Sequence, residues 1–329
     1  MASLPKKHIL VTGGAGYIGS HTARVLLARG YDVTVVDDLS RGYRHNVEPD
    51  RLCVMNVADT EGLVRLMGQR PIDAVVHFAA YIAVGESTAK PELYFANNTC
   101  GSLSLFTAML RAGVKHLVFS STAAVYGMPA SSPITEDVPY DPINPYGESK
   151  VMVEKMLRWF DSIHGLRSIC LRYFNASGAE PRGGFGEEHD PETHLIPLLL
   201  RAVKSGKPVT IFGDDYPTPD GTCIRDYIHV IDLADAHVVA LESLLAGGPS
   251  NRFNVGTGKG HSIREVMATV EEVTGKKVPY TIGPRREGDP PALVADSSKL
   301  QRTLGWQPRN AGLREIVTHA WEFEKNRVV

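Results

Sequence analysis

Short apolar runs alternate with longer amphipathic segments along the first half of the chain. The apolar runs have the length of strands, and the segments between them have the length and periodicity of helices. Strands separated by helices favour an α/β fold with a parallel, doubly wound sheet, in which ligands bind at the carboxyl ends of the strands. The predicted strands cover residues 8–12, 32–38, 73–80, 115–127 and 166–178.

Helical patterns fill the intervals and the end of the chain. Residues 97–113 and 146–160 predict helices, and the second of these places Val151 and Phe160 on or near one apolar face. An amphipathic closing helix is predicted over residues 312–326.

The pattern changes after about residue 175. Residues 178–194 are rich in glycine, proline and acidic side chains, and further irregular stretches follow. We therefore expect a first domain of Rossmann type over residues 1–175 and a smaller C-terminal α/β domain over residues 176–329. A helix and a strand near residues 226–256 are expected to return to the first domain.

Composition and charge exclude several classes of protein. The 329 residues include 35 Lys plus Arg against 37 Asp plus Glu, so we expect no nucleic-acid or anionic-membrane partner. No run approaches the roughly 18–20 apolar residues of a membrane span, and the start of the chain leads into a strand without the pattern of a signal peptide. Four widely separated cysteines favour free thiols in a reducing compartment, and we expect a cytoplasmic protein.

The strongest local motif is the glycine-rich turn in "VTGGAGYIGSH", where Gly13, Gly16 and Gly19 have the spacing G-x-x-G-x-x-G. Such a turn lets a pyrophosphate approach the backbone at the N-terminus of a helix. A glycine turn without a ligand is the alternative. The motif follows a strand, opens a helix and precedes Asp37 by about twenty residues, which favours dinucleotide binding.

The acidic end of the second predicted strand bears on which dinucleotide binds. A carboxylate at Asp37 can accept hydrogen bonds from the adenosine ribose diol, and it would repel a 2′-phosphate. With Asp38 beside it, NAD is favoured over NADP. Because Arg41 lies close in sequence and could bind a 2′-phosphate, NADP stays the alternative.

A second motif, "NPYGESK", places Tyr146 and Lys150 four residues apart, about 6 Å along one helix face. An ammonium near a phenol favours phenolate, as would the positive nicotinamide ring of NAD. Lowering a phenol pKa from about 10 to about 7 needs roughly 4 kcal/mol. With the hydroxyls of "SST" (residues 120–122) one predicted strand earlier, the pair indicates oxidation of a secondary alcohol. A surface pair on an amphipathic helix is the alternative.

These motifs, together with "HFAAYIAVGES", "LRYFNASGA", "DYPTPDGTCIRDYIHV", "NVGTG" and "RREGDPPALVAD", resemble the extended short-chain dehydrogenase/reductase superfamily. Within that superfamily they are most similar to the UDP-glucose 4-epimerase (UDP-galactose 4-epimerase) family. The similarity runs from about residue 8 to residue 300. It implies an NAD-dependent isomerase of nucleotide sugars that interconverts UDP-glucose and UDP-galactose through a 4-keto intermediate.

The resemblance also implies the roles of individual residues. Tyr146 matches the catalytic base, Lys150 its partner, and Thr122 a position that is usually serine. The positions expected to contact NAD are Gly13, Gly16, Tyr17, Ile18, Gly19, Asp37, Asp38, Leu39, Ser40, Arg41, Gly42, Asn56, Val57, Phe78, Ala79, Ala80, Tyr81, Ile82, Asn97, Thr122, Tyr146, Lys150, Tyr173 and Phe174.

A second set of positions matches those that hold the UDP-sugar. Arginines suit a diphosphate because their planar forks bind its oxygens in pairs, although a structural ion pair is the alternative for Arg225 and Arg286. The substrate candidates are Thr122, Tyr146, Asn175, His194, Leu195, Thr210, Phe212, Arg225, Arg286, Asp289 and Leu293.

The chain departs from the family pattern at a few of these positions. Asn56 replaces an acid that reads the adenine amino group, and Ile82 replaces a lysine. Leu293 occupies a position that limits the substituent at C2 of the sugar, so we expect some activity on UDP-N-acetylglucosamine, and UDP-pentoses stay possible. A homodimer formed through the helices near 97–113 and 146–160 is a further family expectation.

Two rival functions differ at named residues. Nucleotide-sugar dehydratases on this scaffold usually carry an Asp-Glu pair where this chain has Ala123 and Ala124. Non-catalytic NAD-binding regulators commonly lack the tyrosine or the lysine, and both are present here.

Other polar clusters are assigned no chemistry. "HDPETH" (residues 189–194) contains two histidines and two acids, but we expect no metal there or elsewhere in the chain. "GDDYPTPDGT" lacks the spacing and the closing glutamate of a calcium loop. His77 lies in a predicted buried strand, where a hydrogen-bonded core histidine is expected.

Overall fold

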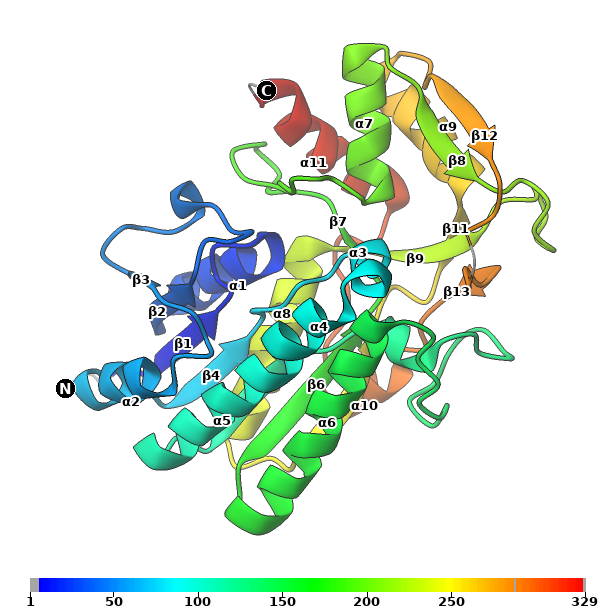
Figure 1. Ribbon diagram of the computed structural model, residues 1–329. Helices are drawn as coiled ribbons and strands as arrows, with labels where there is room; N and C mark the ends of the chain where they lie inside the picture. The colour runs from blue at the N-terminus through cyan, green and yellow to red at the C-terminus, as the bar shows by residue number, and fades with distance from the viewer. Residues whose placement is uncertain (1–5, 287, 328–329) are drawn as a thin grey trace. The chain divides into compact units, whose positions relative to one another are not determined.

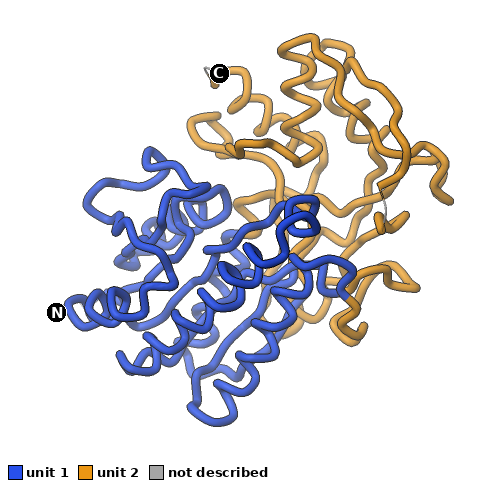
Figure 2. Tube along the Cα trace, in the orientation of Figure 1, with its two compact units in different colours: residues 1–125, 142–172, 234–253 blue, residues 126–141, 173–233, 254–329 orange. Residues whose placement is uncertain are grey.

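The computed structural model describes residues 6–286 and 288–327, and it divides into two compact units (Figure 2). Parts of three predictions lie outside the described residues: the first five and last two residues of the two domains, and position 287 within "RREGDPPALVAD". Unit 1 comprises residues 1–125, 142–172 and 234–253, and unit 2 comprises residues 126–141, 173–233 and 254–329.

Unit 1 is built on a seven-stranded sheet with the order β10-β6-β5-β4-β1-β2-β3. Pairing is parallel between neighbours from β6 to β3, as expected where helical crossovers connect the strands. The prediction of a doubly wound α/β sheet is confirmed. The strands are β1 (His8–Thr12), β2 (Asp32–Asp37), β3 (Leu52–Val54), β4 (Ala74–His77), β5 (His116–Ser120), β6 (Arg167–Tyr173) and β10 (Asn251–Val255).

Three helices of unit 1, α2 (Thr60–Gln69), α5 (Gly101–Ala112) and α6 (Pro145–His164), pack against one face of this sheet (Figure 1). Their apolar sides and the sheet enclose one core that includes Leu10, Phe106 and Leu157. On the other face, Arg29 at the end of α1 (Tyr17–Ala28) pairs with acids of α8 (Val230–Leu245). The short helices α3 (Val84–Ala89) and α4 (Pro91–Tyr94) follow β4.

Unit 2 contains two small sheets and its own core. β7 (Asn175–Ser177), β11 (Gly260–Ser262) and β13 (Ala292–Leu293) each pair with β9 (Ile224–His229), and β8 (Val209–Phe212) pairs with β12 (Tyr280–Gly283). The helices are α7 (Leu195–Ser205), α9 (Ile263–Thr274), α10 (Ser298–Leu304) and α11 (Leu313–Asn326). Apolar residues of α7, α9 and α11 form the core, Leu199, Val266 and Val317 among them.

The segment 166–178, which was predicted as one strand, is two strands. β6 ends at Tyr173, the N–H of Phe174 donates to the carbonyl of Val255 (3.3 Å), and β7 then pairs with β9. The chain thus changes partner strands within one predicted strand. The sequence pattern does not reveal such a change, because no glycine or proline separates β6 from β7.

Two other predicted strands are too long. β4 ends at His77, and β5 ends at Ser120, before a 3-10 turn over Ala123–Tyr126. The Thr122 hydroxyl accepts a hydrogen bond from the N–H of Ala124 (3.1 Å), which turns the chain away from the sheet.

The two predicted helices of unit 1 also differ at their ends. The helix expected over 97–113 begins as a π-helical turn over Phe95–Cys100 and continues as α5. α6 extends the predicted helix at both ends, because Asn144 caps its N-terminus, Pro145 is preset for the first turn, and Gly165 ends it in a left-handed conformation.

Candidate functional site

The glycine turn between β1 and α1 is closed so tightly that no side chain fits at two of its positions. Gly13 has φ +72°, and a Cβ there would overlap the backbone nitrogen of Ala79 after β4. A Cβ at Gly19 would overlap the carbonyl oxygen of Gly13. At Gly16 a Cβ would have room, and this residue begins α1 without a side-chain cap or an acid in the first turn. The helix N-terminus therefore offers N–H groups to an anion.

Asp37, at the carboxyl end of β2, is fixed beside this turn. One carboxylate oxygen accepts the N–H of Ala15 (2.9 Å) and the other accepts the N–H of Leu39 (2.8 Å). Burial raises the pKa of Asp37, and these two hydrogen bonds oppose the shift. Leu39 itself has φ +60°, an uncommon conformation for a branched residue, and it carries the chain back towards the glycine turn.

The residues around Asp37 limit the positive charge available to a 2′-phosphate. Arg41 pairs with Glu86 of α3 at 3.0 Å, and its guanidinium carbon lies 5.4 Å from the centroid of the Tyr81 ring. Asn56 donates its amide N–H to Asp38 (2.7 Å), while its amide oxygen accepts the N–H of Ala58 (2.8 Å). Arg41 is therefore engaged in an ion pair. The alternative that this chain binds NADP, which depended on Arg41, loses its main support.

The remaining cofactor candidates of unit 1 lie on the segments that leave the strands. Val57 follows β3, and the segment from Phe78 to Ile82 follows β4. The N–H groups of Phe78 and Ala79 both donate to the carbonyl of Thr12, at 2.8 and 3.1 Å, which holds this segment against β1. Asn97 lies in the π-helical turn before α5. Tyr173 and Phe174 belong to unit 2.

The tyrosine and lysine of α6 are buried, with exposed fractions of 7% for Tyr146 and 3% for Lys150. Thr122, which follows β5, lies close enough to Tyr146 to affect the pKa of its phenol. The Lys150 ammonium donates to the carbonyl of Ser120 (2.9 Å), and it lies 4.9 Å from the centroid of the Phe119 ring. The structure therefore brings the three residues predicted to be catalytic to the carboxyl end of one strand.

α6 lies close to this strand end because its third residue is small. A Cβ at Gly147 would overlap the carbonyl oxygen of Ala124. The Asn144 side chain accepts the N–H of the same Gly147 (2.9 Å). These two constraints fix the start of the helix, and with it the position of Tyr146.

The pKa values in the chain differ from the sequence-based expectation. Burial raises the pKa of Tyr146, and the influence of the neighbouring Thr122 hydroxyl only partly opposes it. Burial also lowers the pKa of Lys150 to about 7, against the opposing influence of Glu154. In the protein without cofactor, Lys150 therefore does not convert Tyr146 to a phenolate. A phenol pKa near neutrality requires the second positive charge of that hypothesis, the nicotinamide ring of NAD.

Sequence reasoning missed a buried ion pair behind Lys150. Glu154 and Arg172 have side chains that are 2% and 1% exposed, and they approach to 2.7 Å. Glu154 also accepts the hydroxyl of Ser121 (2.5 Å). A periodic signal was present, because Tyr146, Lys150 and Glu154 are spaced four residues apart along one helix face.

In unit 2, several substrate candidates lie on β9 or contact it. Arg225 on β9 is the register partner of Leu293 on β13, and it forms an ion pair with Asp289. The guanidinium carbon of Arg286 lies 4.1 Å from the centroid of the Phe212 ring. The ion pair that was considered for Arg225 is present, and its partner is another candidate.

The other candidates of unit 2 lie on three elements. Asn175 on β7 is the register partner of Tyr227 on β9. Thr210 is exposed on β8. Leu195 begins α7, and His194 occupies the N-cap position of that helix.

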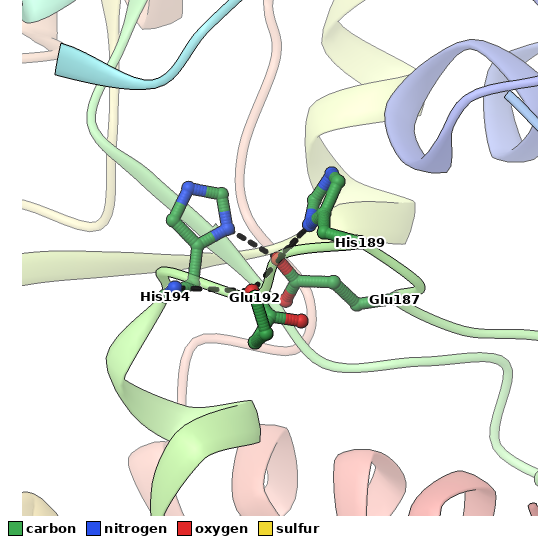
Figure 3. A group of neighbouring side chains, drawn as sticks. All are labelled: Glu187, His189, Glu192 and His194. Atoms are coloured by element: carbon green, nitrogen blue, oxygen red, sulfur yellow. Dashed lines mark hydrogen bonds and ion pairs between the residues drawn. The ribbon is translucent and has the colours of Figure 1, made fainter. Parts of the chain in front are cut away.

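His194 also belongs to a compact group with Glu187, His189 and Glu192 (Figure 3). The Nδ1 atoms of both histidines face the same oxygen of Glu187, at 3.2 Å from His189 and closer from His194. Although burial opposes it, hydrogen bonding to the two glutamates raises the pKa of His189 to about 9. Sequence reasoning assigned His194 to the substrate but expected no metal in this segment, and it missed Glu187, which lies outside "HDPETH".

His77 is confirmed as a core residue. Its ring nitrogens lie 2.6 Å from the Thr12 hydroxyl and 2.9 Å from the Ser102 hydroxyl, and burial lowers its pKa to about 3.

Among residues 6–286 and 288–327, no helix is both long and apolar enough to cross a bilayer.

Comparison with known proteins identifies the relatives of this chain. Residues 9–256 match the NAD dependent epimerase/dehydratase family. The UDP-glucose 4-epimerase of Lactobacillus helveticus is 49% identical over 97% of both chains, and that of Azospirillum brasilense is 52% identical over 97% of this chain and 92% of its own. The crystal structure of UDP-glucose 4-epimerase from Brucella ovis in complex with NAD has a TM-score of 0.94 and 45% identity, and the match covers 97% of this chain and 98% of that one. The chain therefore belongs to the NAD dependent epimerase/dehydratase family.

Proposed function

We propose that this protein catalyses the reversible 4-epimerisation of UDP-glucose and UDP-galactose through a 4-keto sugar. The observation that carries the proposal is the buried Tyr146, beside Thr122 and one helical turn from Lys150, at the carboxyl end of β5. Full-length similarity to proteins named UDP-glucose 4-epimerase supports it.

The residues of unit 1 fit NAD as the resident cofactor. The turn at Gly13 admits no side chain, the N-terminus of α1 lacks a side-chain cap, and the buried Asp37 can receive ribose hydroxyls. We propose that the cofactor candidates of the first domain hold NAD, and that Arg41 stays paired with Glu86. When bound, NAD supplies the oxidation and the later re-reduction at C4 of the sugar.

The proposed tasks of the chain's own residues concern one proton and its environment. Thr122 positions the C4 oxygen, and Tyr146 removes the proton of the C4 hydroxyl and later returns a proton to the same oxygen, after the sugar has presented its opposite face. Because the pKa of Lys150 is about 7, a small change in its surroundings suffices to charge it beside the phenol. Burial of both side chains excludes the water that would weaken this electrostatic effect.

We further propose that the candidates of unit 2 hold the UDP-sugar, with Arg225 and Arg286 on the diphosphate. The Arg225–Asp289 ion pair and the packing of Arg286 on Phe212 restrict both guanidinium groups before substrate binds. Side chains that are already ordered lose less conformational entropy on binding. The domain boundaries at residues 175 and 176 remain part of this proposal.

The test is to incubate the purified protein with UDP-galactose, without added cofactor, and to measure UDP-glucose. In the Tyr146→Phe variant we expect turnover to fall by about 10²–10⁴-fold while the bound NAD is retained. Tyr280→Phe, at an exposed tyrosine of β12, is the matched control and should keep full activity. Unchanged turnover in Tyr146→Phe, or a dehydrated sugar as the product, would reject the proposal.

Leu293 favours a broader substrate range as a secondary proposal. It lies beside Arg225 in the register of β9 and β13, and it is only partly buried. A leucine here leaves more room at C2 of the sugar than an aromatic residue would. We expect measurable turnover of UDP-N-acetylglucosamine, which Leu293→Tyr should abolish while activity on UDP-galactose persists. No turnover at high enzyme concentration contradicts this expectation.

We propose a homodimer that forms through α5 and α6. Leu103 of α5 and Met152, Trp159 and Ile163 of α6 are exposed, which is unusual for so many large apolar side chains on two packed helices.

We also propose a cytoplasmic location, since Cys53, Cys100, Cys170 and Cys223 are all free thiols.

A further inference from the structure

Four side chains of the segment before α7 turn their metal-binding atoms towards one point (Figure 3). One ligand atom from each of Glu187, His189, Glu192 and His194 lies within 4.8 Å of all the others. The distances from His189 Nδ1 to the nearest oxygens of Glu187 and Glu192 are 3.2 and 3.5 Å. Ligand atoms on a tetrahedral zinc ion, with bonds of about 2.0–2.2 Å, are separated by roughly 3.3 Å.

The chemical composition of the group favours one class of cation. Two imidazoles and two carboxylates form an N₂O₂ set, and the imidazoles select zinc and similar transition metals over magnesium and calcium. The two carboxylates carry the charge that balances a divalent ion. Three of the four side chains are at least 80% buried, and the fourth, His194, is 43% exposed, so the group is enclosed by the protein.

Neighbouring groups hold the ligands in place. The Glu192 carboxylate accepts the N–H groups of Thr193 (2.9 Å) and His194 (3.0 Å), and Arg201 of α7 donates to its other oxygen at 3.2 Å. Arg201 also lies 3.8 Å from Glu324 of α11. Contacts of this kind orient ligands and support metal affinity.

We propose that Glu187, His189, Glu192 and His194 bind one zinc ion, in a closed site with four protein ligands. The ion fastens the glycine-rich segment 178–194 to the start of α7. Its role is structural, because four protein ligands leave no open position on the ion. With Nδ1 of His194 on zinc, the substrate contact proposed for this residue falls to its other ring nitrogen. The site belongs to unit 2 alone, and its existence does not depend on the proposed epimerase activity.

The test measures zinc bound by the full-length protein at equilibrium in dialysis against zinc salt, after removal of metal by a chelator. We expect about one zinc per chain for the wild type and for His164→Gln, which alters an exposed histidine at the end of α6. His189→Gln and Glu187→Gln should each raise the dissociation constant at least about tenfold. Equal binding by the wild type and both variants overturns the proposal and leaves the four side chains as an ion-pair cluster.

Cobalt spectra keep the test decisive if a variant folds poorly. The wild-type protein loaded with Co²⁺ should show the strong visible absorption of a four-coordinate ion. A weak spectrum of six-coordinate cobalt in the wild type overturns the proposal without reference to any variant. Circular dichroism of each variant establishes that it is folded before its zinc content is compared.

Discussion

Lys150 occupies a position where its charge is costly without other groups to support it. Its side chain is 3% exposed, and its ammonium finds the carbonyl of Ser120 and the face of Phe119 in place of water. Glu154, one turn further along α6, opposes the effect of burial but is itself held by Arg172. The lysine is therefore poised between its charged and neutral forms near neutral pH.

This shift predicts a pH-dependent stability. The pKa of Lys150 is lowered from 10.5 to about 7 on folding, so between these values the unfolded chain binds a proton that the folded chain does not. Stability then rises with pH across that window, by at most about 1.4 kcal/mol per pH unit. From pH 7.5 to 9, urea unfolding of the nucleotide-free wild type should gain about 2 kcal/mol relative to Lys150→Met. Parallel pH profiles for the two proteins would show that the lysine stays charged.

Residue-level sequence reasoning succeeded in part. The spacing of Tyr146 and Lys150 on one helix face was sufficient to predict that they lie together, since helix geometry fixes it. The raised pKa of Tyr146 was not predictable in this way, because it depends on burial by residues distant in sequence. Glu187 was missed for a similar reason: no local spacing rule joins it to His194.

At the scale of elements, the turn between β1 and α1 is constrained twice, by conformation and by space. Gly13 has φ +72° and contacts the segment after β4. Gly30, after α1, has φ +87°, but the position that a Cβ would occupy there has no other atom within 4 Å. A substitution at Gly30 therefore carries the cost of a left-handed backbone alone, whereas one at Gly13 adds the cost of steric overlap.

We expect Gly30→Ala to lower the free energy of unfolding by about 1–2 kcal/mol, the cost of the conformation alone. Gly13→Ala should cost at least about 3 kcal/mol, because the backbone of Ala79 must also move. Denaturant titrations of the two variants measure both values. Equal losses would mean that the β4 segment yields freely.

The buried pair of Glu154 on α6 and Arg172 on β6 makes a second prediction for these elements. Glu154→Gln leaves an uncompensated guanidinium in the core, and we expect a loss of about 3–5 kcal/mol in urea unfolding. The double variant Glu154→Leu with Arg172→Met removes both charges and should recover most of that loss. A double variant no more stable than Glu154→Gln would assign the pair a positive role in folding.

Element boundaries show where sequence patterns fail. Within residues 166–178, no glycine or proline separates β6 from β7, although the two strands pair in different sheets. Helix ends are easier to predict from sequence, because Asn144, Pro145 and Gly165 mark both ends of α6. Local signals therefore locate helix ends better than they locate exchanges between sheets.

At the scale of the whole molecule, the exposed apolar side chains of α5 and α6 predict the oligomeric state. Trp159 and Ile163 are 58% and 67% exposed. Light scattering after gel filtration should give twice the mass of one chain for the wild type, and Trp159→Glu should shift it towards one chain. Tyr280→Glu, at an exposed aromatic residue of β12, is the control and should leave the mass unchanged. A monomeric wild type would contradict the proposed dimer.

The ion pair between Arg41 and Glu86 constrains how coenzyme preference could evolve. Losing the acid at position 37 alone would weaken the repulsion towards a phosphorylated ribose, yet Asp38 would remain and Arg41 would stay paired with Glu86. Losing Glu86 alone would release the cation while the repulsion persisted. Neither substitution alone would therefore improve the binding of a phosphorylated ribose. A switch in coenzyme requires a mutational path with strong epistasis between two sites that are distant in sequence.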